Sequence, residues 1–206
     1  KWTSVKGEPH IIKRLHVGET YILREEFAPY GYLKAEEVEF TITDTAEIQK
    51  VEMKDDVPIG RIIINKKGEF LSEVSWNDMV AGAMDSIWGY VTGSLKDVTF
   101  EIYAREDIKA ADGESDDYYK KDELVATIKT DELGIARTDD LPLGKYYVVE
   151  KETADGFVLD GEPRDIDLTY RDQDTPVVTF DSEWQNSRQK AKVIVTKKEK
   201  DSDRVL

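Results

Sequence analysis

The sequence predicts an all-β sandwich of short strands, and three observations favour it. Hydrophobic residues alternate with polar ones along many short segments, which is the period of a strand with one buried face. Turn residues separate these segments, for example at Ala28 to Gly31 and at Asp112-Gly113. No segment has helical periodicity over three turns, and Ala81 to Val91 alone is compatible with a short helix. Many short strands joined by polar turns are typical of a β-sandwich.

Seven segments carry the alternation most clearly and are expected to be strands. Because successive side chains of a strand point to opposite faces, the apolar residues of each segment share a face, which we expect to lie on the core. In chain order the segments are marked by these apolar residues: Val38, Phe40 and Ile42; Val51 and Met53; Ile62 and Ile64; Val98, Phe100 and Ile102; Tyr146 and Val148; Val178 and Phe180; Val193 and Val195.

The composition excludes several classes of function. The chain of 206 residues carries 29 lysines and arginines against 44 aspartates and glutamates, a formal net charge of −15. Such an acidic surface repels phosphate groups, so we expect neither nucleic-acid binding nor contact with a membrane. The chain has no cysteine and two histidines, and it carries none of the usual enzyme signatures. We therefore expect no cofactor, no metal and no enzyme activity toward other molecules.

Two internal repeats indicate how the chain is organised. The stretch Gly18 to Glu25 resembles Gly144 to Glu150, since each has an aromatic residue, an aliphatic residue and a glutamate at alternate positions. A second repeat joins Gly60 to Lys66 with Ala191 to Lys197, and each copy is an alternating segment that ends in lysine.

The repeats predict three units. Residues 1–57 are expected to be the C-terminal part of one sandwich domain, and residues 58–190 a complete domain with an insertion. Residues 191–206 are expected to be the first strand of a further domain. Two explanations stay open: the sequence is a window on a longer array, or its two ends complement each other.

Three polar residues stand where the alternation demands apolar ones. Lys66, Glu150 and Asn186 each share the parity of the apolar residues of their own strand. A lysine, a carboxyl and a carboxamide in one core are unfavourable unless they satisfy one another. Burial disfavours the charged forms, so we expect a neutral amine beside a protonated acid.

This combination predicts a specific reaction. A neutral amine is a nucleophile, and a protonated carboxyl can polarise an amide carbonyl and shuttle protons. We therefore expect an isopeptide bond between Lys66 and Asn186, formed with loss of ammonia and assisted by Glu150. Simpler interpretations are an edge lysine, a carboxylate paired with a surface lysine, and an asparagine in a turn. Lys67, the next residue, is the alternative lysine for the bond, and Lys66 is preferred because its parity matches the apolar residues of the strand.

These residues also resemble a known family. Lys66 on the first strand, the strand Gly144 to Glu150 with its following turn, and Asn186 on the last strand are similar to the collagen-adhesin B-type domains of Gram-positive surface adhesins and pilins. The resemblance implies an Ig-like or transthyretin-like (prealbumin-like) β-sandwich in tandem repeat domains. It assigns Lys66 as nucleophile, Glu150 as catalytic acid and Asn186 as acceptor. Asp155 replaces the family's usual proline, which weakens the turn but not the glutamate assignment.

The first unit matches the same pattern in part. The resemblance implies Glu25 as a second catalytic glutamate and Asp55 as its acceptor, in a reaction that loses water. No lysine of this unit occupies the matching position. A solvated pair with the adjacent Asp56 is the simpler interpretation of Asp55. If the two ends complement each other, Lys197 on the tail is the candidate lysine.

The resemblance implies a structural function. We expect a stalk or shaft module of a Gram-positive adhesin or pilin, extracellular and anchored to the cell wall, with neighbouring repeat domains as partners. One alternative is an adhesin domain that binds a host matrix protein through exposed aromatic residues. Trp76, Trp88 and Tyr90 are the candidates for that surface. A further alternative is an accessory carbohydrate-binding module of a secreted enzyme.

Overall fold

The computed structural model describes residues 1–80, 83–191, 193–200 and 205, and of residues 75–80 and 83–88 it describes the backbone alone. These residues form eleven strands, and none of them belongs to a helix able to cross a membrane. In chain order the strands are β1 (Thr20–Leu23), β2 (Val38–Thr41), β3 (Ile59–Val80), β4 (Ala83–Ser94), β5 (Thr99–Ala104), β6 (Leu124–Lys129), β7 (Ile135–Arg137), β8 (Leu141–Pro142), β9 (Gly144–Glu152), β10 (Arg164–Leu168) and β11 (Val177–Asn186).

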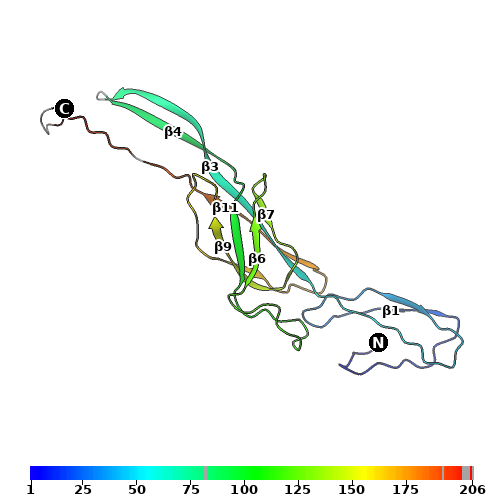
Figure 1. The fold of residues 1–206 in the computed structure, drawn as a ribbon. Coiled ribbons are helices and arrows are strands. Elements are labelled where there is room, and N and C mark those ends of the chain that lie inside the picture. The colour runs from blue at the N-terminus through cyan, green and yellow to red at the C-terminus, as the bar shows by residue number, and fades with distance from the viewer. Residues whose placement is uncertain (81–82, 192, 201–204, 206) are drawn as a thin grey trace.

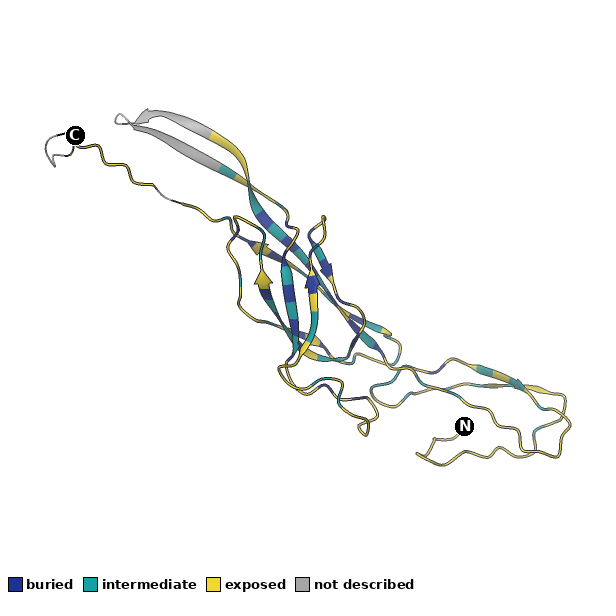
Figure 2. Ribbon diagram, in the orientation of Figure 1, coloured by how far each residue is buried: buried dark blue, intermediate teal, exposed yellow. Residues whose placement is uncertain are grey.

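Strands β3 to β11 form a sandwich, as the sequence predicts (Figure 1). One sheet has the order β10-β9-β5-β6, and the other is built on β3, which pairs with β11, β4, β7 and β8. The buried residues concentrate on the strands of this sandwich (Figure 2). The largest fully buried apolar side chains come from both sheets and from Val98 just before β5: Ile62, Ile64, Val98, Phe100, Ile102, Tyr146, Val148 and Leu168.

The buried faces are those that the alternation predicts. Along β5, every second residue is buried, so Phe100 and Ile102 enter the core while their neighbours stay partly exposed. Trp184 of β11 meets Phe100 edge to face, with ring centroids 5.5 Å apart. Such aromatic pairs stabilise a core beyond their buried area, and this pair joins the two sheets directly.

The first and last strands of the sandwich lie side by side and run parallel. The register pairs Ile59 with Val177 at one end and Gly68 with Asn186 at the other. Lys66 is opposite Trp184 in this ladder. Residues of equal parity on paired strands share a face, so Lys66 and Asn186 are neighbours on the inner face.

Strand β3 continues beyond the sandwich and forms a hairpin with β4. The ladder runs from Lys67 paired with Ser94 to Val80 paired with Ala83, and the hairpin projects past the other strands (Figure 1). We call this hairpin, from Leu71 to Tyr90, the arm. The short helix considered for Ala81 to Val91 is wrong for the described residues, because β4 occupies them from Ala83 on. Glycines at 89 and 93 disfavour a helix, and the extended β3 offers a partner for the backbone groups.

Two of the expected strands do not form. The segments around Val51 and Met53 and around Val193 and Val195 have no strand assignment. Val193 and Val195 are more than four-fifths exposed. A strand needs a neighbouring strand to satisfy its backbone groups, and neither segment has one among the described residues.

The N-terminal residues form a separate small sheet that is joined to the sandwich. Its strands β1 and β2 are antiparallel. The Ala28 N–H donates to the side-chain oxygen of Gln173, and the Lys34 N–H donates to the backbone oxygen of Gln173, both at 2.9 Å. The Tyr30 and Tyr170 rings meet edge to face with centroids 4.8 Å apart. The loop before β11 therefore holds the N-terminal part.

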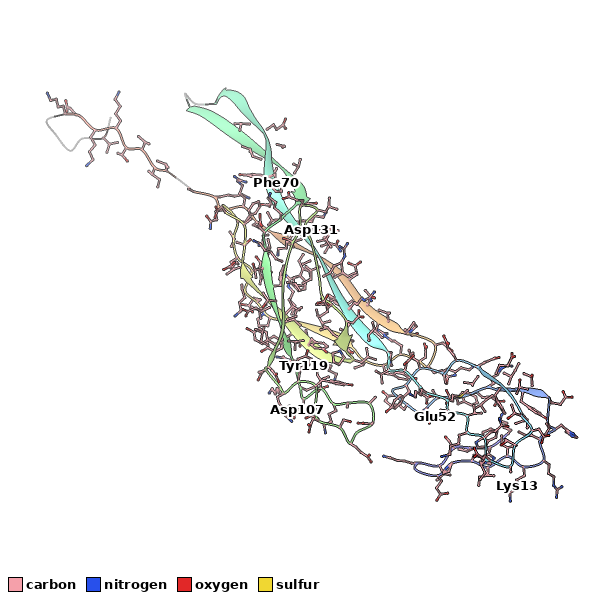
Figure 3. All side chains as sticks on the ribbon, turned by 45° about the vertical axis from the view of Figure 1, so that its right-hand side comes forward. Lys13, Glu52, Phe70, Asp107, Tyr119 and Asp131 are labelled. Carbon is pink, nitrogen blue, oxygen red and sulfur yellow. The ribbon has the colours of Figure 1, made fainter. Side chains whose placement is uncertain are left out.

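The molecule is elongated. The N-terminal part lies at one end, the sandwich in the middle, and the arm and the C-terminal tail at the other end (Figure 1). In Figure 3, Lys13 and Glu52 mark the N-terminal part, and Phe70 marks the base of the arm. The domain boundaries placed near residues 57 and 190 stay predictions.

Candidate functional site

Lys66 is fixed by the backbone around it. Its N–H donates to the Gly134 carbonyl at 2.7 Å, and its own carbonyl accepts from the Leu95 N–H at 2.9 Å. Gly134 has a φ of 74°, and a Cβ added there would lie 2.5 Å from the Lys66 oxygen. The turn before β7 therefore needs glycine at this position to approach the lysine.

Glu150 reaches Lys66 from the opposite sheet. It lies on β9, where the register pairs it with Phe100 of β5. Its Oε2 accepts a hydrogen bond from Lys66 Nζ at 2.6 Å, and the two side chains are 0% and 1% exposed. Lys67, the rival of Lys66, is only half-buried.

Burial makes the charged form of Lys66 less favourable than it is in water. Burial lowers the pKa of Lys66 below its usual value of 10.5, and the contact with Glu150 opposes that shift. The Phe100 ring lies on another side of the amine, with its centroid 5.6 Å from Nζ. A lysine held among apolar groups can therefore lose its proton more readily than one in water.

Asn186 presents its carboxamide to the same carboxyl group. Its Nδ2 donates to Glu150 Oε1 at 2.5 Å and to Thr153 Oγ1 at 2.8 Å. Its Oδ1 is buried and has no hydrogen-bond partner among the described residues. The residue itself is 2% exposed.

The structure thus brings together the three residues that parity selects. One oxygen of Glu150 contacts the lysine amine and the other contacts the amide nitrogen of Asn186. A carboxyl placed in this way can take a proton from a nucleophile and give one to a leaving nitrogen. The carbonyl oxygen that Glu150 is expected to polarise is not its partner here.

Sequence reasoning missed Thr153 as a member of this cluster. It is the first residue after β9, and its hydroxyl oxygen accepts from Asn186 Nδ2. Its position three residues after Glu150 carries no periodic signal, because the strand ends between the two. The contact depends on the path of the turn that follows.

A family model described as SpaA, a prealbumin-like fold domain, matches residues 1–57 and 90–184, which is more than half of the chain. This chain belongs to that family. The resemblance drawn from the sequence is confirmed at the level of family and fold. The part of this SpaA-type chain between the two matched ranges contains β3 and most of the arm.

Solved structures of three proteins are similar to this SpaA-type chain. The Bacillus anthracis TIE protein is 21% identical with a TM-score of 0.49, covering 82% of this chain and 25% of its own. GBS52, the minor pilin of Streptococcus agalactiae, is 13% identical with a TM-score of 0.41, covering 90% of this chain and 66% of its own. The major pilin SpaD of Corynebacterium diphtheriae is 21% identical with a TM-score of 0.37, and the match covers 63% of this chain and 30% of SpaD.

The chain therefore spans less than two thirds of the length of each of these three proteins. No curated protein matches this SpaA-type chain.

The second predicted pair, Glu25 and Asp55, is close enough for the charge of Glu25 to act on Asp55. Glu25 is half-buried, and its Oε2 accepts from the Ala35 N–H at 2.8 Å. Partial burial raises the pKa of Asp55, and the nearby charges of Glu25 and Asp56 add to that rise. The carboxyl groups of Glu25 and Asp55 thus lie near each other in the N-terminal part.

Lys197 does not complete this second site within one chain. It is exposed on the C-terminal tail, and the two ends of the chain lie far apart (Figure 1).

The aromatic residues considered for partner binding are described only in part. The side chains of Trp76 and Trp88 lie outside the described residues. Tyr90 is 37% exposed, and the Lys190 ammonium lies 4.5 Å from its ring centroid. Across the described part of the chain, no three His, Cys, Asp or Glu side chains gather as they would around a metal ion.

Proposed function

We propose that this SpaA-type chain is a shaft module of a Gram-positive surface adhesin or pilus, locked by an isopeptide bond between Lys66 and Asn186. The observation that carries the bond is the bridging carboxyl of Glu150, which touches the amine and the carboxamide at once in a buried setting. Such a cluster is costly for stability unless it reacts or remains fully paired. Asn186 Oδ1 has no partner within the part of the chain that the structure describes, so the pairing there is incomplete.

The reaction balances with the groups present. The Nζ of Lys66, as a neutral amine, attacks the side-chain carbon of Asn186. The new carbon–nitrogen bond forms as the bond to Nδ2 breaks. One proton passes from Nζ to Glu150, and Glu150 supplies one to Nδ2, which leaves as ammonia. No oxidant, metal or cofactor is needed.

Accurate mass measurement of the intact folded protein tests the bond. We expect a mass lower than the sequence mass by one ammonia. Glu150→Ala removes the proton carrier, so this variant should keep the full mass while remaining folded. Glu152→Ala on the same strand is the matched control and should still lose ammonia. A folded wild-type protein with its full mass would contradict the proposal.

The setting is proposed from the family and from the names of similar proteins. GBS52 and SpaD are described as pilins. By analogy, this chain would be displayed outside the cell on a wall-anchored protein, with neighbouring units of that protein as its partners. A covalent lock suits a module that transmits tension, because it does not depend on the redox environment, as a disulfide would.

We also propose a second bond, in which Asp55 is the acceptor and Glu25 the catalytic acid. The proximity of Glu25 to Asp55 supports it, because the charge of Glu25 adds to the partial burial that raises the pKa of Asp55, and attack of an amine on a carboxyl group releases water. Lys197 of a second copy is the candidate nucleophile, because the two ends of one chain lie apart.

A denaturing gel tests this second bond after long incubation at high protein concentration. We expect multiples of the monomer that disappear with Lys197→Ala and persist with Lys200→Ala. A single monomer band from the wild-type protein would contradict the proposed bond between Lys197 and Asp55 of two copies.

A further inference from the structure

Thr153 holds the group that must leave in the proposed reaction. Its hydroxyl oxygen accepts a hydrogen bond from Asn186 Nδ2 at 2.8 Å, and Glu150 Oε1 accepts the other. Both protons of this nitrogen are therefore used. The amide cannot turn about its last side-chain bond without losing both contacts.

Thr153 also lies between the buried amide and the surface. It is half-buried, whereas Lys66, Glu150 and Asn186 are all buried. Thr153 lines an open pocket of about 500 Å³, together with Phe70, Leu95, Ala154 and Phe157. The three reacting residues do not line this pocket.

We propose that Thr153 is a positioning residue for the bond-forming reaction. It orients the carboxamide of Asn186 and holds Nδ2 on the side from which ammonia reaches the pocket. This inference rests on the proposed function.

The chemistry explains why this position matters. The bond from Lys66 Nζ to the side-chain carbon of Asn186 forms while the bond from that carbon to Nδ2 breaks. As Nδ2 gains a proton from Glu150, it becomes a better donor, so its hydrogen bond to Thr153 Oγ1 strengthens. An interaction that strengthens along the reaction lowers the barrier rather than merely stabilising the starting state.

The test follows the reaction in freshly synthesised protein. The chain is made in a cell-free reaction, samples are quenched in denaturant at intervals, and the loss of ammonia is read from the intact mass. A protease added to parallel samples reports when the fold has formed. The variants are Thr153→Val, which keeps the shape without the hydroxyl, and Thr153→Ser, which keeps the hydroxyl. Thr127→Val, at an exposed position on β6, is the matched control.

We expect Thr153→Val to fold on the wild-type time scale and to lose ammonia about tenfold more slowly, which is the effect of one hydrogen bond of about 1.4 kcal/mol. Thr153→Ser should restore most of the rate, which a purely structural role for the β-branched side chain would not predict. If Thr153→Val fails to resist the protease, Thr153→Ala replaces it with the same expectation.

The outcomes separate this inference from the proposed function. A wild-type protein that never loses ammonia overturns the proposed function, and this inference with it. A wild-type protein that reacts while Thr153→Val reacts equally fast overturns the positioning role alone. A serine variant as slow as the valine variant also overturns it.

Discussion

Lys66 gives the molecule a pH dependence that the isopeptide bond would hide. In Asn186→Ala the bond cannot form, so the lysine remains titratable. Burial lowers the pKa of Lys66 in the folded state below its usual 10.5. Between the lowered value and 10.5 the unfolded chain binds more protons, so the free energy of unfolding should rise with pH through this range and then level off. Urea denaturation at a series of pH values measures the slope.

The control is the double variant with Lys66→Met, which should lack that rise. Equal slopes in the two proteins would show that the folded environment does not disfavour the charged lysine.

Gly134 sets the position of the Lys66 backbone and should tolerate no side chain. Gly134→Ala places a Cβ 2.5 Å from the Lys66 oxygen at a positive φ, so the turn or the strand must shift. We expect a loss of about 1–3 kcal/mol of stability and slower bond formation. Gly113→Ala is the matched control, since its φ is 67° and no atom lies within 4 Å of an added Cβ. Thermal unfolding should show a clearly smaller effect there.

At the scale of single residues, parity selects most of the candidate site. Lys66, Glu150 and Asn186 stand out because a polar residue on an apolar face is costly and needs a reason. Thr153 could not be selected in this way, because it lies beyond the end of its strand and meets Asn186 through the course of a turn. The orientation of the Asn186 amide is likewise a matter of local geometry that no sequence pattern encodes.

At the scale of elements, we expect the sandwich to fold without the arm. Leu71 and Val74 on its β3 side and Tyr90 on its β4 side are exposed, so the core does not depend on them. Replacing residues 73–89 with a tight Asn-Gly turn should leave the melting temperature of the sandwich within a few degrees of wild type, and ammonia should still be lost. Calorimetry and intact mass check both expectations. A large drop in melting temperature would mean that the arm helps to hold the sandwich together.

Predicted segments that form strands differ from predicted segments that do not in whether they have a neighbouring strand. Segments with a neighbouring strand on each side, such as β5 and β9, form where alternation places them. The segment at Val193 and Val195 has the same alternation but no partner among the described residues, so it stays exposed. The arm was difficult to predict because its second strand depends on a partner strand that the local sequence does not reveal. Its second strand has a composition compatible with a helix, and pairing with the extension of β3 decides its conformation.

For the whole molecule, the proposed bond should raise stability by closing a long loop. It would link the first strand of the sandwich to the last, so the unfolded chain loses the entropy of a loop of more than a hundred residues. We expect Asn186→Ala, which keeps the Lys66–Glu150 pair, to unfold with about 4 to 5 kcal/mol less stability. This corresponds to a melting temperature lower by roughly 10 to 15 °C. Asn65→Ala, on the same sheet, is the control and should change the melting temperature far less.

The parallel arrangement of β3 and β11 also determines which residues would bear a pulling force applied to the two ends of the sandwich. A pull on the chain enters the sandwich at Ile59 and leaves it after Asn186, at opposite ends of the same ladder. With Lys66 joined to Asn186, the force would pass along Ile59 to Lys66, cross the bond and leave. Everything between Lys67 and Gln185, the arm included, would be shielded from stress. Loops in that stretch could lengthen or shorten over evolution without changing how far the module extends under load.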